Sequence, residues 1–381
     1  MSGRASVAFR QCAELFDVLV AGDGESAILK AIEPNAPSFI DADDPKTDLF
    51  LTSAKLNELP FPARHLVDVE SYHYSIDGVP AISMIAQLGC PFGCGFCGGR
   101  SSPMLRRIRT RTSENVVAEM KEIYKRYGIC GFMFYDDELN VNMNMIELME
   151  SITELQRDLK TEFKLRGFIK AQLFTDEQAR AMYRAGFRWI LTGFESGSER
   201  ILTNINKQST LEENTRCMDI ARRNGLKVKA LMSLGHPGES YGSISDTARW
   251  LIEVRPNDFD VTIITTYPGS PYYDEAVRYG EVWKYTHPLT GDNLYAYELD
   301  YMETADYYKG DPNGGYKAFV YTDHLIADSL VACRNNMEEF VRQSLNIPFN
   351  PSASSRKYEH SMGQGLGTDI LRRSETVCLK K

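Results

Sequence analysis

Six short apolar runs, each followed by an amphipathic segment, occupy the middle of this 381-residue chain. The amphipathic segments place apolar residues three and four positions apart, which is helical spacing, while the apolar runs have the length of buried strands. Strands that alternate with helices in this way are typical of a parallel sheet with helices outside it. The sequence therefore predicts an α/β fold, a full or partial barrel of six β/α units. The predicted strands cover residues 81–88, 130–136, 163–170, 187–196, 227–235 and 259–269.

Capping residues mark the ends of several predicted helices. We expect Ser113 to cap the first of these helices and Gly128 to end it, because serine favours N-caps and glycine tolerates the left-handed conformation at helix ends. Thr175 is expected to cap the helix after the third strand. Thr210 and Glu213 fit a capping box at the start of the helix after the fourth strand.

The composition is that of an ordinary globular protein, with a net charge of −9 and a sequence pI near 5.4. An acidic chain without a long basic run argues against nucleic-acid binding. No segment approaches the roughly 18 apolar residues of a membrane span. The first residues, "MSGRASVAFRQCAELF", lack the uninterrupted apolar core of a signal peptide, so we expect a cytoplasmic protein.

Three of the eight cysteines fall within eight residues, at Cys90, Cys94 and Cys97, in the glycine-rich loop after the first predicted strand. Three thiolates can bind three irons of a [4Fe–4S] cluster and leave the fourth iron open for chemistry. In a reducing compartment such a group indicates metal binding or catalysis more often than disulfides. A zinc site is the alternative, and it would need a fourth ligand, whereas the other cysteines are scattered singly.

The pattern Cys90-x3-Cys94-x2-Cys97, at the end of the first strand of a six-unit β/α chain, resembles the radical S-adenosylmethionine (SAM) superfamily over about residues 80 to 280. The resemblance implies a partial (β/α)6 barrel and two cofactors, a [4Fe–4S] cluster and SAM. In that superfamily the open iron binds the amino and carboxylate groups of SAM. One electron, from a donor such as flavodoxin or ferredoxin, then cleaves SAM to methionine and a 5′-deoxyadenosyl radical, which takes a hydrogen atom from a small-molecule substrate.

The same resemblance assigns SAM-binding roles to residues near the strand ends. Phe96, the aromatic residue before the last cysteine, is expected near the adenine. Asp137 and Glu138 follow the second strand without the usual glycine pair and are expected to hold the methionine amino group, with an acidic helix cap as the alternative. Tyr267, after the sixth strand, is expected beside the adenine, and a purely structural role is the alternative.

The segment "GFESGSERIL" ends the fourth predicted strand. Glu195 and Ser196 resemble the family residues that bind the SAM ribose or carboxylate. Arg200 is expected to pair with the SAM carboxylate through two parallel hydrogen bonds. The alternative is that this segment is simply a helix start with Ser198 as its cap.

Three residues at strand ends are candidates for catalysis: Lys170, Glu195 and His236. Lys170 ends the third strand, at the edge where active sites of β/α folds lie, and is expected to contact the substrate. His236 lies in the loop after the fifth strand. For His236 a hydrogen-bonded structural role is the alternative.

We expect three segments: an N-terminal segment over residues 1–78, the partial barrel over 79–280, and an α-rich extension over 281–381 that covers the active site. The runs "VLVAGDGESAILKAIE", "LNELPFPARHLVD" and "YEHSMGQGLG" resemble the cobalamin-binding-type subgroup of radical SAM proteins. Only about one strand and one helix precede Asp41, and no Asp-x-His-x-x-Gly pattern is present. The sequence therefore predicts a short βα remnant of a cobalamin domain, which argues against cobalamin-dependent methyl transfer.

The expected function is that of a single-cluster radical enzyme acting on a polar small molecule of the sugar, uronic acid or nucleoside type, in secondary metabolism such as antibiotic biosynthesis. We expect decarboxylation or diol dehydration, because no second electron acceptor is evident. The alternatives are a radical dehydrogenase or epimerase, a cobalamin-assisted methyltransferase, and a non-catalytic iron–sulfur or zinc protein. Tyrosines between Tyr295 and Tyr316 are expected to form a lid over the substrate, ahead of an amphipathic helix near residues 330–345.

Overall fold

The centre of the molecule is one curled sheet of seven strands in a computed structural model that describes residues 15–72, 74–299 and 316–348. Neighbouring strands follow one another in sequence, and all pairs are parallel except the first, which is antiparallel. The six predicted barrel strands and the partial barrel are therefore confirmed. The strands are β3 (Ser75–Ile76), β4 (Val79–Met84), β7 (Gly131–Phe134), β8 (Lys164–Phe168), β9 (Phe187–Glu195), β10 (Lys227–Leu234) and β11 (Asp258–Ile263).

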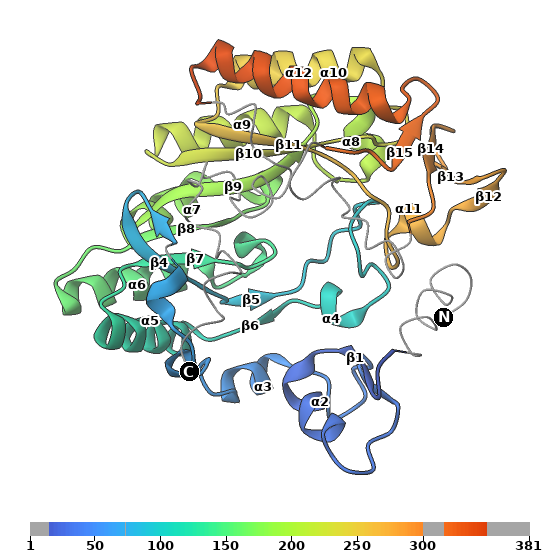
Figure 1. Cartoon of the computed structure of the whole chain (residues 1–381). Coiled ribbons are helices and arrows are strands. Elements are labelled where there is room, and N and C mark those ends of the chain that lie inside the picture. The colour runs from blue at the N-terminus through green and yellow to red at the C-terminus, as the bar shows by residue number, and fades with distance from the viewer. Residues whose placement is uncertain (1–14, 73, 300–315, 349–381) are drawn as a thin grey trace, which may run out of the picture.

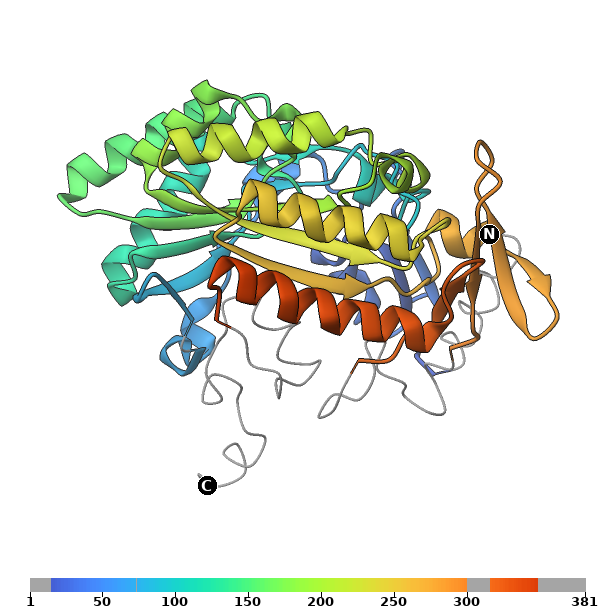
Figure 2. The ribbon, with the colours of Figure 1, turned by 90° about the horizontal axis from the view of Figure 1, so that it is seen from above.

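Helices cover the outer face of this sheet, and Figures 1 and 2 show them arranged along its convex side. The main hydrophobic core lies between these two layers. On β10, Val228, Ala230 and Met232 point into that core. Because side chains alternate along a strand, Lys229 and Ser233 point to the concave side. The helices are α5 (Ser113–Tyr127), α6 (Met145–Leu159), α7 (Asp176–Ala185), α8 (Glu199–Ile205), α9 (Leu211–Arg223) and α10 (Tyr241–Val254).

Most of the predicted helix caps are confirmed. Gly128 ends α5 in the left-handed conformation, and Thr175 and Thr210 both form capping boxes. The prediction for the start of α5 was one residue too late. Thr112, not Ser113, is the N-cap, and its side chain accepts the backbone N–H of Asn115. The reason is that Thr112 keeps the extended backbone of a cap, while Ser113 is already helical.

A small parallel pair of strands, separate from the main sheet, forms the N-terminal part. It consists of β1 (Leu19–Gly22), α2 (Gly24–Ala31) and β2 (Phe39–Ala42). The sequence predicted the first strand and the helix but not β2. Asp23, after β1, forms a buried ion pair with Arg109, which ties this unit to the segment after the cysteine loop. The remaining short elements of this half of the chain are α3 (Ser53–Glu58), β5 (Gln87–Leu88), α4 (Pro103–Arg106), β6 (Arg109–Thr110) and the 3-10 helices η1 (Arg64–Leu66), η2 (Val69–Tyr72), η3 (Leu139–Val141, after β7) and η4 (Ala171–Leu173, after β8).

The C-terminal extension begins as a four-stranded antiparallel sheet, which the sequence did not predict. Tyr295 lies within this sheet, while most of the tyrosine-rich stretch and the "YEHSMGQGLG" run fall outside the described residues. The predicted C-terminal helix is present. These elements are α11 (Pro271–Asp274), β12 (Val277–Tyr279), β13 (Val282–Thr286), β14 (Asn293–Ala296), β15 (Val320–Thr322) and α12 (Ala327–Leu345).

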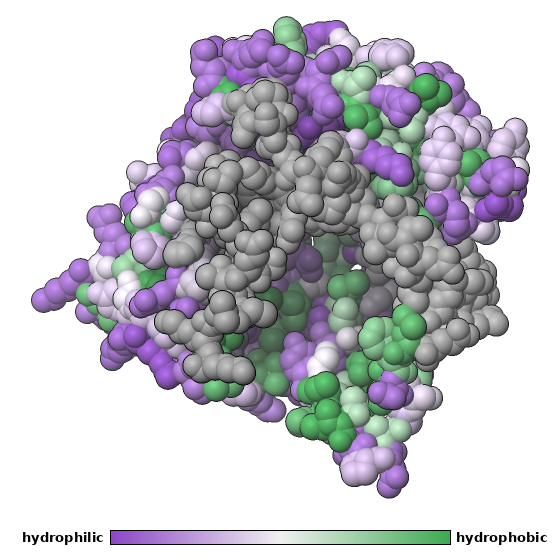
Figure 3. Space-filling view, viewed as in Figure 1, coloured by the Kyte–Doolittle hydropathy of each residue, from purple (hydrophilic) through white to green (hydrophobic). Residues whose placement is uncertain are grey.

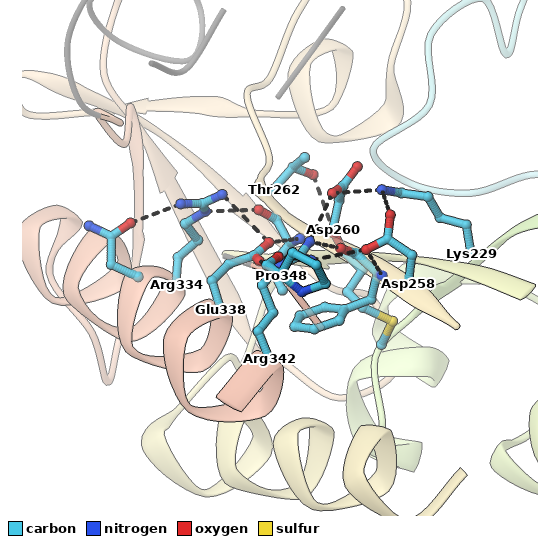
Figure 4. Close-up of polar contacts among 12 residues, drawn as sticks. Lys229, Asp258, Asp260, Thr262, Arg334, Glu338, Arg342 and Pro348 are labelled. Atoms are coloured by element: carbon cyan, nitrogen blue, oxygen red, sulfur yellow. Dashed lines mark hydrogen bonds and ion pairs between the residues drawn. The ribbon is translucent and has the colours of Figure 1, made fainter. Parts of the chain in front are cut away.

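Side chains of α12 take the place of a further strand along the open edge of β11. Glu338 accepts the backbone N–H of Val261 at 2.8 Å, and Arg334 donates to the carbonyl of the same residue at 2.9 Å. Arg342 donates to the carbonyl of Phe259 (Figure 4). An edge strand exposes unpaired backbone groups, so the helix ends the sheet by satisfying them. Within the described ranges no helix combines the length and apolar character needed to cross a membrane.

Candidate active site

The three cysteines of the motif lie on the loop after β4, at the carboxyl end of the parallel strands. Cys94 is buried, and Cys90 and Cys97 are half-buried; none is in a disulfide. The loop backbone is held from outside: Gly95 donates to the carbonyl of Ile205 at 2.8 Å, at the end of α8. The carbonyl of Gly95 accepts from Tyr272 in α11 at 3.0 Å. Elements far apart in sequence therefore fix the position of the loop.

Two tyrosines pack directly against the glycines of this loop. A side chain at Gly95 would collide with the ring of Tyr272, and a Cβ at Gly98 would lie 2.6 Å from the ring of Tyr267. Glycine is therefore required at both positions for the rings to approach the backbone. Tyr267 is 42% exposed and lies beside the cysteine loop, as expected from its strand, but its predicted contact with adenine stays a prediction.

The donor chemistry of the loop fits an iron–sulfur cluster. Burial raises the pKa of the Cys90 and Cys97 thiols. A metal or cluster is therefore needed to favour their thiolate forms, as coordination does. Among the described residues, no group of three or more His, Cys, Asp and Glu side chains is close enough to hold one metal ion. A [4Fe–4S] cluster sets a different requirement, because each cysteine binds a separate iron.

The acidic residues after β7 have three different surroundings. Asp136 is buried and accepts the backbone N–H of Ala86 at 3.2 Å; burial raises its pKa to about 7. Asp137 is exposed and accepts the N–H of Gly89 at 2.9 Å, one residue before Cys90. Burial raises the pKa of Glu138 to about 7, although nearby lysines oppose the shift. Two of these carboxyls therefore fasten the start of the cysteine loop.

Glu195, at the end of β9, is the centre of a buried polar chain. Its Oε1 lies 2.9 Å from the ammonium of Lys207, and its Oε2 accepts the hydroxyl of Ser233 at 2.7 Å. Burial alone would raise the pKa of Glu195, but the Lys207 ammonium and these hydrogen bonds hold it below its usual value. The backbone of Glu195 has φ +66°, where the β9–β10 register shifts. Such strain in a residue other than glycine is concentrated at functional sites.

His236 continues this chain and is fully buried. Its Nε2 lies 2.8 Å from the Ser233 hydroxyl oxygen. Because Ser233 gives its one proton to Glu195, the oxygen must accept from Nε2–H, which assigns the tautomer of His236. Within the described chain Nδ1 has no hydrogen-bond partner. Burial lowers the pKa of His236 to about 3, and its ring meets Phe96 edge-on at 5.3 Å.

Lys170 follows β8 and is only 2% exposed. Its ammonium donates to the backbone carbonyl of Lys207 at 2.9 Å and lies 4.3 Å from the ring centroid of Phe92, between Cys90 and Cys94. Burial, followed by the charge of Lys207, lowers the pKa of Lys170. The ammonium is thus directed at the cysteine loop, and its predicted contact with substrate stays a prediction.

Ser196 and Arg200 are occupied by partners within the chain. The Ser196 hydroxyl lies 3.1 Å from that of Thr247. Arg200 donates from both sides of its guanidinium to Asp292, with Nε 3.0 Å from Oδ2, in the loop before β14. The bidentate carboxylate partner expected for Arg200 is therefore found inside the protein. Binding of the SAM carboxylate by Arg200 would require it to leave Asp292.

Sequence reasoning missed three residues of this site: Lys207, Ser233 and Asp292. Ser233 could have been predicted from the sequence, because it lies four residues after Lys229 on β10 and side chains an even number of positions apart on a strand point to the same face. Lys207 lies in the loop after α8, and Asp292 lies in the loop before β14. The sequence around these two residues has no helical or strand periodicity, so it does not indicate that their side chains reach the site.

The radical SAM superfamily model matches residues 84–251. Among curated proteins, the chain is 28% identical to an uncharacterized methyltransferase of Pyrococcus horikoshii, over 58% of this chain and 47% of that protein. It is 24% identical to the anaerobic magnesium-protoporphyrin IX monomethyl ester cyclase of Cereibacter sphaeroides, over 74% of this chain and 48% of that protein. The chain thus spans about half the length of these relatives.

A solved structure of the radical SAM methyltransferase TsrM from Kitasatospora setae, with cobalamin and a [4Fe–4S] cluster, matches with a TM-score of 0.49 and 19% identity, over 54% of this chain and 39% of that chain. The family match covers four of the six parallel strands, β7 to β10, together with the last residue of β4 and the cysteine loop. The superfamily uses a [4Fe–4S] cluster and SAM, the two cofactors that the cysteine motif predicts for this chain. Over residues 84–251 the chain is thus similar to the radical SAM superfamily, the family that its three-cysteine motif resembles.

Proposed function

We propose that Cys90, Cys94 and Cys97 hold the cluster, and that the enzyme abstracts a hydrogen atom from a small molecule on the concave side of the half-barrel. The single observation that carries this proposal is the anchored three-cysteine loop at the carboxyl edge of a parallel sheet. When bound, the cluster and SAM supply one electron and a sulfonium, which yield methionine and a 5′-deoxyadenosyl radical. The electron comes from an external donor, for which we propose flavodoxin or ferredoxin.

The chain's own residues hold the cofactor side of the site in one arrangement. Lys207 and Ser233 hold the carboxylate of Glu195 in one orientation, so its remaining lone pairs can accept hydrogen bonds from a ligand without movement of the side chain. Phe96 and the neutral ring of His236 form an aromatic wall beside the last cysteine. We propose that this wall packs against the adenosyl group and that Glu195 accepts from its ribose hydroxyls.

The concave side offers a surface for an organic substrate. Tyr135 is 45% exposed there, its ring 6.2 Å from that of the half-buried Phe168. Ile85, after β4, is 38% exposed. Figure 3 shows a hollow near the centre of the molecule with hydrophobic surface inside it. Aromatic faces with a hydroxyl suit the ring of a sugar or nucleoside, and we propose a substrate of that class.

The fate of the substrate radical after hydrogen abstraction decides the reaction class. Loss of CO2 or of water remains our first proposal, because neither needs a second electron acceptor. Methyl transfer is the second candidate, favoured by the names of relatives, which include a bacteriochlorophyllide d C-12(1)-methyltransferase of Chlorobaculum tepidum, 25% identical over 51% of this chain.

The decisive experiment is product analysis after anaerobic reconstitution with iron and sulfide. With dithionite and SAM, we expect 5′-deoxyadenosine and methionine from the wild type and neither from Cys94→Ser. Cys333→Ser, on the C-terminal helix, is the matched control and should retain both products. A wild-type protein with an intact cluster that forms no 5′-deoxyadenosine under these conditions would refute hydrogen abstraction.

Mass spectrometry then distinguishes the reaction classes. Turnover with candidate sugar acids and diols should give products lighter by CO2 or by water. Formation of S-adenosylhomocysteine that depends on added cobalamin, together with a methylated product, would instead establish the second candidate.

A further inference from the structure

Lys170 differs from the other buried lysines of the described chain in its partners. Lys207 pairs with Glu195 at 2.9 Å, and Lys229 lies between Asp258 at 2.7 Å and Asp260 at 2.9 Å (Figure 4). Lys170 is equally buried, yet within the described residues no carboxylate forms an ion pair with it. Its acceptors are the backbone carbonyl of Lys207 and the face of Phe92.

A buried ammonium without a counter-anion is unfavourable, because one carbonyl and an aromatic face replace only part of its lost hydration. The surroundings of Lys170 indicate where an anion belongs. Phe92 lies between the first two cysteines, and the adjacent Gly93 and Gly95 are hydrogen-bonded to residues 205–206 of the segment that also carries Lys207. Among the charges that favour the protonated form of Lys170, that of Cys94 is the largest, followed by Glu138 and Cys90.

We propose that Lys170 is the counter-cation of the iron–sulfur cluster and sets its reduction potential. This inference rests on the proposed ligation by Cys90, Cys94 and Cys97. The three thiolates bring negative charge to the cluster, and reduction adds one electron without making or breaking a bond to the protein. A nearby buried ammonium stabilises the reduced, more negative state more than the oxidised state, so it raises the reduction potential.

Lys207 cannot supply this charge to the same extent, although it is close to the loop. Its ammonium is paired with Glu195, so the two together add no net charge to the site. Glu138 also interacts with Lys170, and in its ionised form it would oppose the ammonium and lower the potential. Arg100 is a second cation beside the loop, where it donates to the backbone carbonyls of Cys90 and Phe92. The charge of Lys170 is not offset by a carboxylate among the described residues, so a neutral substitution of Lys170 should reveal its effect on the reduction potential.

The test measures the potential of the reconstituted protein without SAM, by a dithionite titration followed by electron paramagnetic resonance. Lys170→Met should shift the midpoint potential to a more negative value, and Lys170→Arg should restore most of the shift because it keeps the charge. Lys164→Met, at the opposite end of β8, removes a partly exposed charge and should leave the potential unchanged. Iron and sulfide contents verify equal loading.

The outcomes separate this inference from the proposed function. An unchanged potential in fully loaded Lys170→Met overturns it, and so does an unchanged potential accompanied by weaker SAM binding, which would assign the ammonium to the SAM carboxylate. A further outcome is that Lys170→Met and Lys170→Gln fold, as measured by circular dichroism, and yet lose the cluster. In that case, a Lys170→Arg protein that retains the cluster supports the counter-cation, and a Lys170→Arg protein that also loses the cluster overturns it. A wild type that binds no [4Fe–4S] cluster would refute the proposed function itself.

Discussion

Lys207, which follows α8, and Glu195, which ends β9 before α8, form a buried ion pair with Nζ 2.9 Å from Oε1. Glu195 adopts φ +66° at the point where β9 and β10 shift register. A space at Gly193 is needed, since a Cβ there would lie 3.0 Å from the Lys207 ammonium. Backbone geometry and side-chain electrostatics are thus coupled at this point.

Removing one member of this pair should be strongly destabilising. Lys207→Met leaves the carboxylate of Glu195 buried without its cation, and we expect a loss of about 3–5 kcal/mol in the free energy of unfolding. Replacing both residues, as in Lys207→Met with Glu195→Gln, should recover part of that loss. Urea denaturation of the three proteins measures this, and a single variant as stable as the wild type would contradict the prediction.

The buried carboxyl of Glu239 should make stability depend on pH. Burial raises its pKa from 4.5 to about 7, against opposing hydrogen bonds from Ser243 and Gly235. The folded state therefore binds more protons than the unfolded state between those values, and the contribution of this group to stability falls as pH rises from about 4.5 to above 7.

Glu239→Gln cannot titrate and isolates that contribution. The difference in unfolding free energy, wild type minus variant, should decrease as pH rises through this window and level off above it. Denaturation at several pH values provides the measurement. A difference that stays constant or increases with pH would show that the carboxyl is not protonated in the folded state.

Glu338 should be essential for attachment of α12 to the sheet. Its carboxylate accepts from the backbone of Val261 and pairs with Arg342, Nε to Oε2, at 2.6 Å. Glu338→Ala leaves two arginines, Arg334 and Arg342, without this partner in the buried network, and we expect a loss of about 3–5 kcal/mol. The neighbouring exposed Glu339→Ala is the control and should change stability by less than about 0.5 kcal/mol. Similar effects of both substitutions on thermal unfolding would refute the edge-capping role.

The N-cap of α5 offers a direct comparison of two adjacent residues. Thr112→Ala removes the side-chain acceptor for the N–H of Asn115 and should cost about 1 kcal/mol. Ser113→Ala changes a residue already inside the helix and should cost less. Chemical denaturation of both variants decides between them, and a larger effect of Ser113→Ala would restore the assignment favoured by the sequence.

The fold was more predictable than the site. The six strands and the caps at Thr175 and Thr210 follow from local spacing, because strand and helix periods extend over only a few residues. The sequence did not predict the sheet formed by β12–β15, because its strands are short and the pair of β14 with β15 joins segments that are far apart in the chain. At the site, the sequence predicted the cysteine loop but did not predict Lys207, Ser233 and Asp292, which bind the residues around it.

The sequence by itself determined the alternation of strands and helices, the position of the three-cysteine loop at the carboxyl edge of the sheet, and the resemblance to a cluster-binding family. Only the tertiary structure decided how the charges are paired. Arg200 is bound to Asp292, 92 residues away, while Lys170 is buried beside the cysteine loop without a carboxylate among the described residues. The physical reason is that periodicity is a local property of the chain, whereas the energy of a buried charge depends on groups that meet only after the chain has folded.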